Sequence, residues 1–130
     1  MKPKEQASEH TLIMLDVAKR MGIYVEESIK TLSPGTIEFA ALNDQIELES
    51  AVLENPNTPA AQFFTAKVDK RLQSPRYLEA NQQSKKLIDL LSGAVQKWLE
   101  LGTTLHDFSK NPSFIRRSAI ELIRGMINSV

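Results

Sequence analysis

The fold is decided by residues 75–102, which read PRYLEANQQSKKLIDLLSGAVQKWLELG. At about 100° per residue, the apolar side chains of this stretch gather on roughly half of a helical circumference. They are Leu87, Ile88, Leu90, Leu91, Ala94, Val95, Trp98, Leu99 and Leu101. Lysines and carboxylates occupy the other half, and Gly102 supplies the residue that commonly closes a helix. The pattern predicts a long amphipathic helix over 75–101 that organises the molecule.

Four dipeptides mark further helix boundaries, namely Ser33-Pro34, Thr58-Pro59, Ser74-Pro75 and Asn111-Pro112. A Ser, Thr or Asn side chain caps the unpaired N–H groups of a helix start, and proline fits the first helical position. We predict helices near 8–32, 36–54, 59–73, 75–101 and 112–128. No stretch alternates apolar and polar residues as a strand does. The expected fold is all-α, a single-domain bundle of about five helices (8–130) with the fourth (75–101) central, after a disordered tail (1–7).

Composition narrows the class of protein. The chain of 130 residues is 42% hydrophobic and 25% charged, which suits one ordinary core. No apolar run approaches the roughly 20 residues that span a bilayer, and the charged N-terminus does not resemble a secretory signal. The absence of cysteine excludes disulfide and thiolate chemistry. We therefore expect a cytoplasmic protein with no membrane association and no cofactor.

Charge is unevenly distributed along the chain, although the formal net charge is zero. Every charged residue between 36 and 54 is acidic, whereas lysine and arginine dominate residues 67–86. We predict that the acidic and basic helices lie side by side and neutralise one another, within one chain or across a dimer. A neutral total argues against a nucleic-acid-binding footprint.

The predicted second helix is apolar on two opposite sides. One stripe contains Ile37, Ala41, Leu48 and Val52, and the other contains Phe39, Leu42, Ile46 and Leu53. Polar residues separate the two stripes on both flanks. A helix with two apolar stripes needs cover on both sides, either from helices of the same chain or from a second molecule.

The predicted first helix also has surplus apolar residues. Its main stripe consists of Met14, Val17, Ala18, Met21, Val25 and Leu32, but Leu12 and Ile23 project onto its polar face. Either Gly22 breaks the helix and redirects Ile23, or these residues form an interface. Together with the second helix, the pattern favours a homo-oligomer, with a homodimer first, or an obligate partner. The candidate partner-binding residues are Leu12, Ile23, Ile37, Ala41, Leu48 and Val52.

Catalytic and metal sites find little support in the sequence. Neither His10 nor His106 has a carboxylate or a second histidine at helical spacing, so we expect no metal site. The best candidate for catalysis is the loop 103–111, which carries His106, Asp107 and several hydroxyl groups. Adjacent residues of one short loop rarely aim at one another as a base and its orienting group must. We interpret this loop as a polar connection, and we do not expect an enzyme.

Nucleic-acid binding has two candidate regions. Residues 17–29 superficially resemble a helix-turn-helix, but the second helix would open with Glu26-Glu27, which would repel phosphates. In the third helix, Phe63 projects between Lys67 and Lys70, close to Arg71, and could stack on a base. Arg76 and Arg116 lie in opening helical turns, which suggests an anion or an acidic partner. Arg116 also falls inside an apolar stripe, so it either snorkels to the edge or pairs with an acid of the second helix.

The leading hypothesis is a non-catalytic protein–protein interaction protein, such as an adaptor, a chaperone-like or inhibitory partner, or an assembly component. The alternative is a regulator that binds nucleic acid through a basic helical face made of Lys67, Lys70, Arg71, Arg76, Lys85 and Lys86. Phe63 and Arg116 are further candidates for binding nucleic acid or another anion. A second alternative is an enzyme with its site at the His106 loop. The second stripe of residues 37–52 carries most of the argument for association.

Overall fold

A computed structural model describes residues 9–101 and 106–129 of the chain. It contains five α-helices and one 3₁₀ helix: α1 (Glu9–Lys30), α2 (Ile37–Glu54), α3 (Pro59–Arg71), α4 (Pro75–Leu101), η2 (His106–Lys110) and α5 (Pro112–Asn128). The described residues contain no strand, so the predicted all-α class is confirmed. The predicted tail, residues 1–7, and most of the predicted closing turn after α4 lie outside the described residues.

Local capping explains where several helices begin. The Thr58 hydroxyl accepts a hydrogen bond from the Ala61 N–H, and the Asn111 side chain accepts one from the Phe114 N–H. The predicted bounds of α2 (36–54) agree with the structure to within one residue, but its N-cap is Thr36, which accepts from the Phe39 N–H, and not Ser33 as predicted. Gly35 has a φ of 90°, a left-handed conformation that a helix start cannot contain. The chain therefore turns after Pro34 before α2 can begin.

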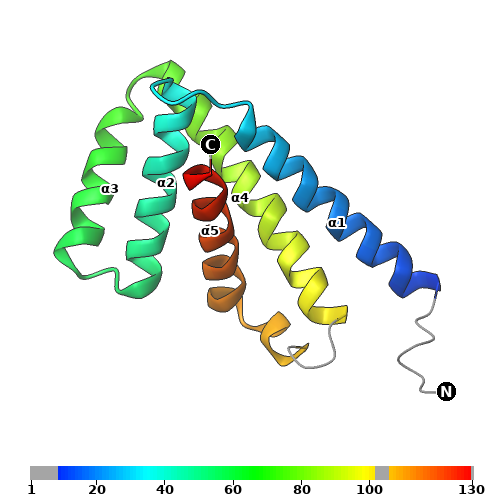
Figure 1. Cartoon of the computed structure of the whole chain (residues 1–130). Coiled ribbons are helices and arrows are strands. Elements are labelled where there is room, and N and C mark those ends of the chain that lie inside the picture. The colour runs from blue at the N-terminus through cyan, green and yellow to red at the C-terminus, as the bar shows by residue number, and fades with distance from the viewer. Residues whose placement is uncertain (1–8, 102–105, 130) are drawn as a thin grey trace.

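The fourth helix is central, as the sequence predicts. It packs against α1, α2, α5 and η2, and it supplies a large share of the buried apolar residues, including Ile88, Leu91 and Ala94. Figure 1 shows α4 running through the middle of the bundle, with α1 antiparallel to it on one side and α2 and α5 on the other. The third helix lies at the edge opposite α1, beyond α2.

The first helix continues unbroken through Gly22, which excludes the first of the two alternatives for Ile23. A Cβ atom at residue 22 would lie 2.9 Å from Cη2 and 3.2 Å from Cζ2 of Trp98. Glycine therefore allows α1 and α4 to approach closely at the indole ring. Because residues 17–29 form one continuous helix, they contain no helix-turn-helix.

The buried face of α1 differs from the predicted stripe. Ala18, Gly22, Val25 and Ile29 are buried and recur every three or four residues, which places them on one face. Val17 was predicted to join this face, but it is exposed. A narrow stripe suffices because α1 packs mainly against one neighbour, α4, and only lightly against α5.

The second helix is covered on both sides by its own chain. Leu42, Ile46 and Leu53 pack into the main core with α4 and α5. Ala41, on the opposite stripe, packs with Tyr77 and Ala80 of α4, and α3 lies along the same side. The two-sided pattern thus reflects neighbours within one chain, which removes the main sequence argument that α2 needs a second molecule.

The acidic second helix is neutralised inside the chain, as one of the two predicted arrangements requires. Asp44 pairs with Lys67 and Arg71 of α3, while α5 supplies the partners of the next two acids. Glu49 lies 2.6 Å from Arg116 Nε, and Glu47 lies 3.3 Å from Arg124 Nη2. These pairs hold α3 and α5 on two flanks of α2.

Candidate functional site

Exposed large apolar side chains are concentrated on α1. Among the described residues, six of the eleven such side chains belong to this helix: Leu12, Ile13, Leu15, Val17, Ile23 and Tyr24. The other five, Val52, Phe63, Leu78, Phe108 and Leu122, are distributed over the other helices. Single exposed apolar residues are ordinary on a protein surface, but a cluster of them calls for an explanation.

One flank of α1 forms a wall beside α4. Met21 lines a hollow of about 340 Å³ together with Lys86, Asp89 and Leu90 of α4. A second hollow of about 420 Å³ is lined by Tyr24, Ser28, Thr31, Leu32, Gln83, Lys86, Leu87 and Leu90. Lys86 and Leu90 line both hollows, so the two form one continuous depression between the helices. We call it the α1/α4 groove.

Two further exposed residues extend this wall along α1. Ile13, Val17, Met21 and Tyr24 follow one another at spacings of three and four, so they share one flank of the helix. Ile13 and Val17 therefore continue the wall towards the N-terminal end of α1. This flank was not predicted from the sequence, because Val17 and Met21 were assigned to the core. The i, i+4, i+8, i+11 spacing from Ile13 to Tyr24 was the signal that could have identified it.

Two hydroxyl groups of the α1 wall donate hydrogen bonds to backbone carbonyls of the same segment. The Ser28 hydroxyl donates to the Tyr24 carbonyl at 2.8 Å, and the Thr31 hydroxyl donates to the Ser28 carbonyl at 2.7 Å. Lys86 is the charged residue common to both hollows, and no carboxylate of the described residues lies within salt-bridge distance of it. The groove combines an apolar floor with a polar rim that includes Lys86 and Asp89.

The predicted partner-binding residues do not form one surface. Leu12 and Ile23 are exposed on α1, but on a different side of the helix from the wall. Ala41 was predicted to lie at the surface, but it is fully buried, and Ile37 packs beside it. Leu48 and Val52 line a separate shallow hollow with Glu49, Leu53 and Thr65. The helices that cover α2 separate these residues from α1.

The predicted anion-binding residues do not converge either. Phe63 is 62% exposed and packs edge-on against Phe64, with ring centroids 5.3 Å apart. Lys67 and Arg71, however, turn away to Asp44, at 3.3 Å and 2.7 Å. Lys70 and Arg76 have no carboxylate partner within 4 Å in the part of the chain that the structure describes. Of the three cations considered around Phe63, Lys67 and Arg71 are therefore engaged within the fold.

Arg116 forms an ion pair with an acid of the second helix, which was one of the two alternatives predicted for it. Its Nε donates to Glu49 at 2.6 Å and its Nη1 donates to Asp89 of α4. Burial by itself would lower the pKa of Arg116, but the hydrogen bonds to Glu49 and Asp89 outweigh it and raise the pKa. The guanidinium is thus committed to carboxylates of α2 and α4 rather than to an external anion.

A cluster of polar residues under α3 was not predicted. Asp44 is only 4% exposed, and its Oδ2 accepts from Arg71 Nη1 and from the Tyr77 hydroxyl, each at 2.7 Å. Burial, and next the hydrogen bond to Asp44, raise the pKa of Tyr77 above its ordinary value. Beside it, Asn81 donates to Gln45 at 2.9 Å, and both side chains are buried. At helical spacing Gln45 falls between the two apolar stripes of α2, where a solvated side chain is expected, so its burial could not be predicted from the sequence.

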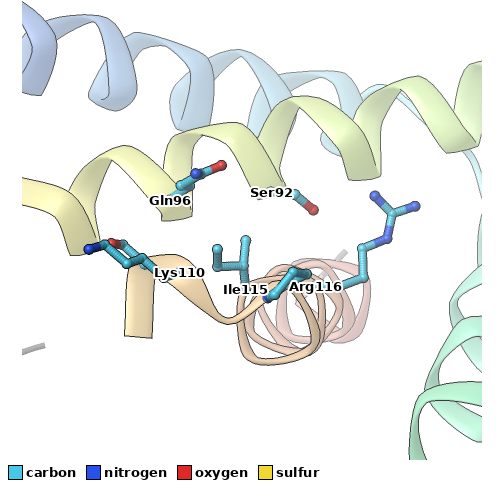
Figure 2. A pocket seen from close by; sticks show the side chains of 7 residues that line it. Ser92, Gln96, Lys110, Ile115 and Arg116 are labelled. Atoms are coloured by element: carbon cyan, nitrogen blue, oxygen red, sulfur yellow. The ribbon is translucent and has the colours of Figure 1, made fainter. Parts of the chain in front are cut away.

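A shallow hollow lies beside η2, the helix that begins at His106. It has a volume of about 300 Å³ and lies between η2, α4 and α5. Figure 2 shows Ser92 and Gln96 on α4 along one side, with Lys110 and Arg116 on opposite sides of Ile115. The Ser92 hydroxyl donates to the Ile88 carbonyl of its own helix, and Arg116 is held by two carboxylates. Residues 103–105 and the side chain of His106 lie outside the described residues.

Among the described residues, no group of three or more His, Cys, Asp or Glu side chains is placed to hold a metal ion. None of the helices in that part of the chain combines the length and the apolar character needed to cross a membrane.

No protein family matches the chain, and comparisons with curated proteins and with solved structures also found no match. Function is therefore inferred from the side chains of this chain and from their arrangement.

Proposed function

We propose that this protein is a non-catalytic protein–protein interaction protein that self-associates through the α1/α4 groove. The observation that carries the proposal is the clustering of exposed apolar residues on α1, of which Ile13, Val17 and Tyr24 adjoin an apolar depression. Contiguous apolar surface of this kind is characteristic of interaction sites. The site differs from that predicted from sequence, since it lies on α1 and α4 instead of α2.

A second copy of the chain suits this surface. Two antiparallel helices side by side form half of a four-helix bundle, and a two-fold axis over the groove would complete the other half. From residue 13 to residue 31 the wall is about 27 Å long at a rise of about 1.5 Å per residue, which is ample for such a contact. The formal net charge of zero means that copies do not repel one another as whole molecules.

The proposal that the protein is non-catalytic is supported by how its polar groups are used. In the hollow beside η2, the Ser92 hydroxyl and the Arg116 guanidinium are both bound within the fold. In the groove, Ser28 and Thr31 donate to backbone carbonyls of α1. An active site requires groups that converge on a substrate, and in these two hollows the groups named are directed elsewhere.

Light scattering during size-exclusion chromatography tests the proposal with two matched variants. Val17, in the groove wall, is 41% exposed, and Leu122 on α5 is 43% exposed. We expect the wild-type chain to elute with the mass of a dimer. Val17→Glu should weaken the dimer by about tenfold or more, because it would place a carboxylate in an apolar interface. Leu122→Glu should leave it unchanged.

Two results would overturn the proposal. One is a wild-type chain that remains monomeric at the highest concentration it tolerates. The other is equal weakening by Val17→Glu and Leu122→Glu, which would show that any added carboxylate disturbs association. Helical circular dichroism of each variant establishes that the comparison is made between folded chains.

A further inference from the structure

The third helix is attached to the molecule by α2 and by little else. Among the described residues, α2 is the one helix against which α3 packs extensively, and no side chain of α3 joins the main core cluster. Only Ala61 and Val68 of its thirteen residues are buried. Figure 1 shows α3 at the outer edge of the bundle, connected by a turn at each end. Removing α3 would thus leave the main core intact.

A carboxylate holds α3 in place. Lys67 and Arg71 are four residues apart, so both cations lie on one side of α3 and reach Asp44 of α2, at 3.3 Å and 2.7 Å. The Tyr77 hydroxyl of α4 donates to the same carboxylate at 2.7 Å. Because Tyr77 belongs to α4, it would keep Asp44 oriented if α3 moved away. We call these four residues the Asp44 clamp.

The surface beneath α3 has the character of a binding site. It presents the second apolar stripe of α2, in which Ile37 and Ala41 pack with Tyr77, and it places the Asp44 carboxylate between apolar residues. Towards the end of α2, Leu48, Val52 and Leu53 line a hollow of about 300 Å³ that α3 reaches only with Thr65. An apolar stripe with one fixed, oriented carboxylate selects for an amphipathic helix that carries cations.

We propose that this face of α2 is a second binding site, for a basic amphipathic helix, and that α3 is its built-in occupant. The ligand is defined by what α3 itself supplies: apolar residues at i and i+4, as in Phe64 and Val68, and cations at i and i+4, as in Lys67 and Arg71. A partner helix of this type displaces α3 and takes over the Asp44 clamp. The site is distinct from the α1/α4 groove, and it does not depend on the dimer.

The first part of the test opens the site by repulsion. Lys67→Glu with Arg71→Glu places two carboxylates opposite Asp44 and leaves the α2 face unchanged. We expect backbone amides of α3 to exchange with solvent about tenfold faster or more than in the wild-type chain, while α1, α4 and α5 keep their protection. Lys70→Glu with Arg76→Glu is the control, because it changes the net charge equally at cations that have no salt-bridge partner among the described residues.

The second part supplies the ligand in trans. A fluorescent peptide with the sequence of residues 57–74 is added, and its anisotropy is followed. We expect its affinity for the opened variant to be at least about tenfold higher than for the wild-type chain or the control, because α3 occupies the site in both of these. A peptide carrying the two glutamate substitutions should not bind.

Three results would overturn this inference. In the first, α3 stays as protected in the opened variant as in the control. In the second, the opened variant does not bind the peptide. In the third, all helices lose protection together, and the milder pair Lys67→Gln with Arg71→Gln also unfolds the whole chain, since α3 would then belong to one cooperative unit with the core.

Discussion

The two edge helices, α1 and α3, are attached to the bundle by different physical means. On α1, Ala18, Val25 and Ile29 are completely buried, and Gly22 lets the helix close onto Trp98. On α3, a half-exposed pair of cations binds one buried carboxylate, and few apolar atoms leave the solvent. Both helices are at the periphery in Figure 1, but only α1 is part of the core.

The magnitudes explain why the difference matters. Burying one large apolar side chain stabilises a fold by about 1.5–3 kcal/mol, whereas an ion pair at the surface contributes about 0–1 kcal/mol. In the Asp44 clamp the desolvation of the buried Asp44 offsets part of its attraction to the two partly exposed cations. A helix attached through the core is fixed and can offer its outer flank to a partner. A helix attached mainly through charges can leave, and the surface beneath it then becomes available.

The largest expected difference is between the stability effects of truncating one buried residue on each edge helix. Ile29→Ala should lower the free energy of unfolding by about 2–5 kcal/mol, because it empties a fully buried site in the main core. Val68→Ala should instead increase local opening of α3 and leave the global transition almost unchanged. Urea unfolding followed by Trp98 fluorescence measures the first effect, and amide exchange measures the second. A loss of global stability as large for Val68→Ala as for Ile29→Ala would contradict the distinction between the edges.

Two glycine substitutions test how closely α1 is packed. Gly22→Ala should destabilise the fold by about 1–2 kcal/mol, since overpacking against Trp98 outweighs the gain in helix propensity. A Cβ atom at residue 125 of α5 would meet no atom within 4 Å. Gly125→Ala should therefore stabilise the fold by about 0.5–1 kcal/mol, through its higher helix propensity. Thermal unfolding of both variants gives the comparison. If both alanines stabilise the protein, then α1 and α4 are less tightly packed at residue 22 than the structure indicates.

The smallest effect concerns the phenol of the Asp44 clamp. The chain has two tyrosines, so Tyr24→Phe leaves Tyr77 as the only one. Because the pKa of Tyr77 is raised in the folded chain, its contribution to stability is complete below the unfolded pKa of about 10 and is lost as the pH rises above it. In an alkaline absorbance titration, tyrosinate should therefore form well above pH 10. A midpoint near that of free tyrosine would mean that the clamp is open in solution.

Much of the fold was accessible from the sequence. The apolar half of residues 75–101 identified α4, and Thr58-Pro59 and Asn111-Pro112 marked the starts of α3 and α5, because these signals act within one helical turn. The pairing of the acidic second helix with basic helices was also predicted. The candidate site was not, because Val17 was assigned to the core and Ala41 to the surface, whereas the structure has them the other way round.

The sequence by itself determined the spacing of apolar residues along each helix, because this spacing involves only neighbours three and four residues away. The tertiary structure alone decided which side of α1 was buried, that Gly22 would admit Trp98 instead of breaking a helix, and that α3 would cover the second stripe of α2. It also decided that Asp44 would be an interior charge. These outcomes depend on how helices distant in the chain approach one another, because a helical pattern specifies an apolar face but not the element that packs against it.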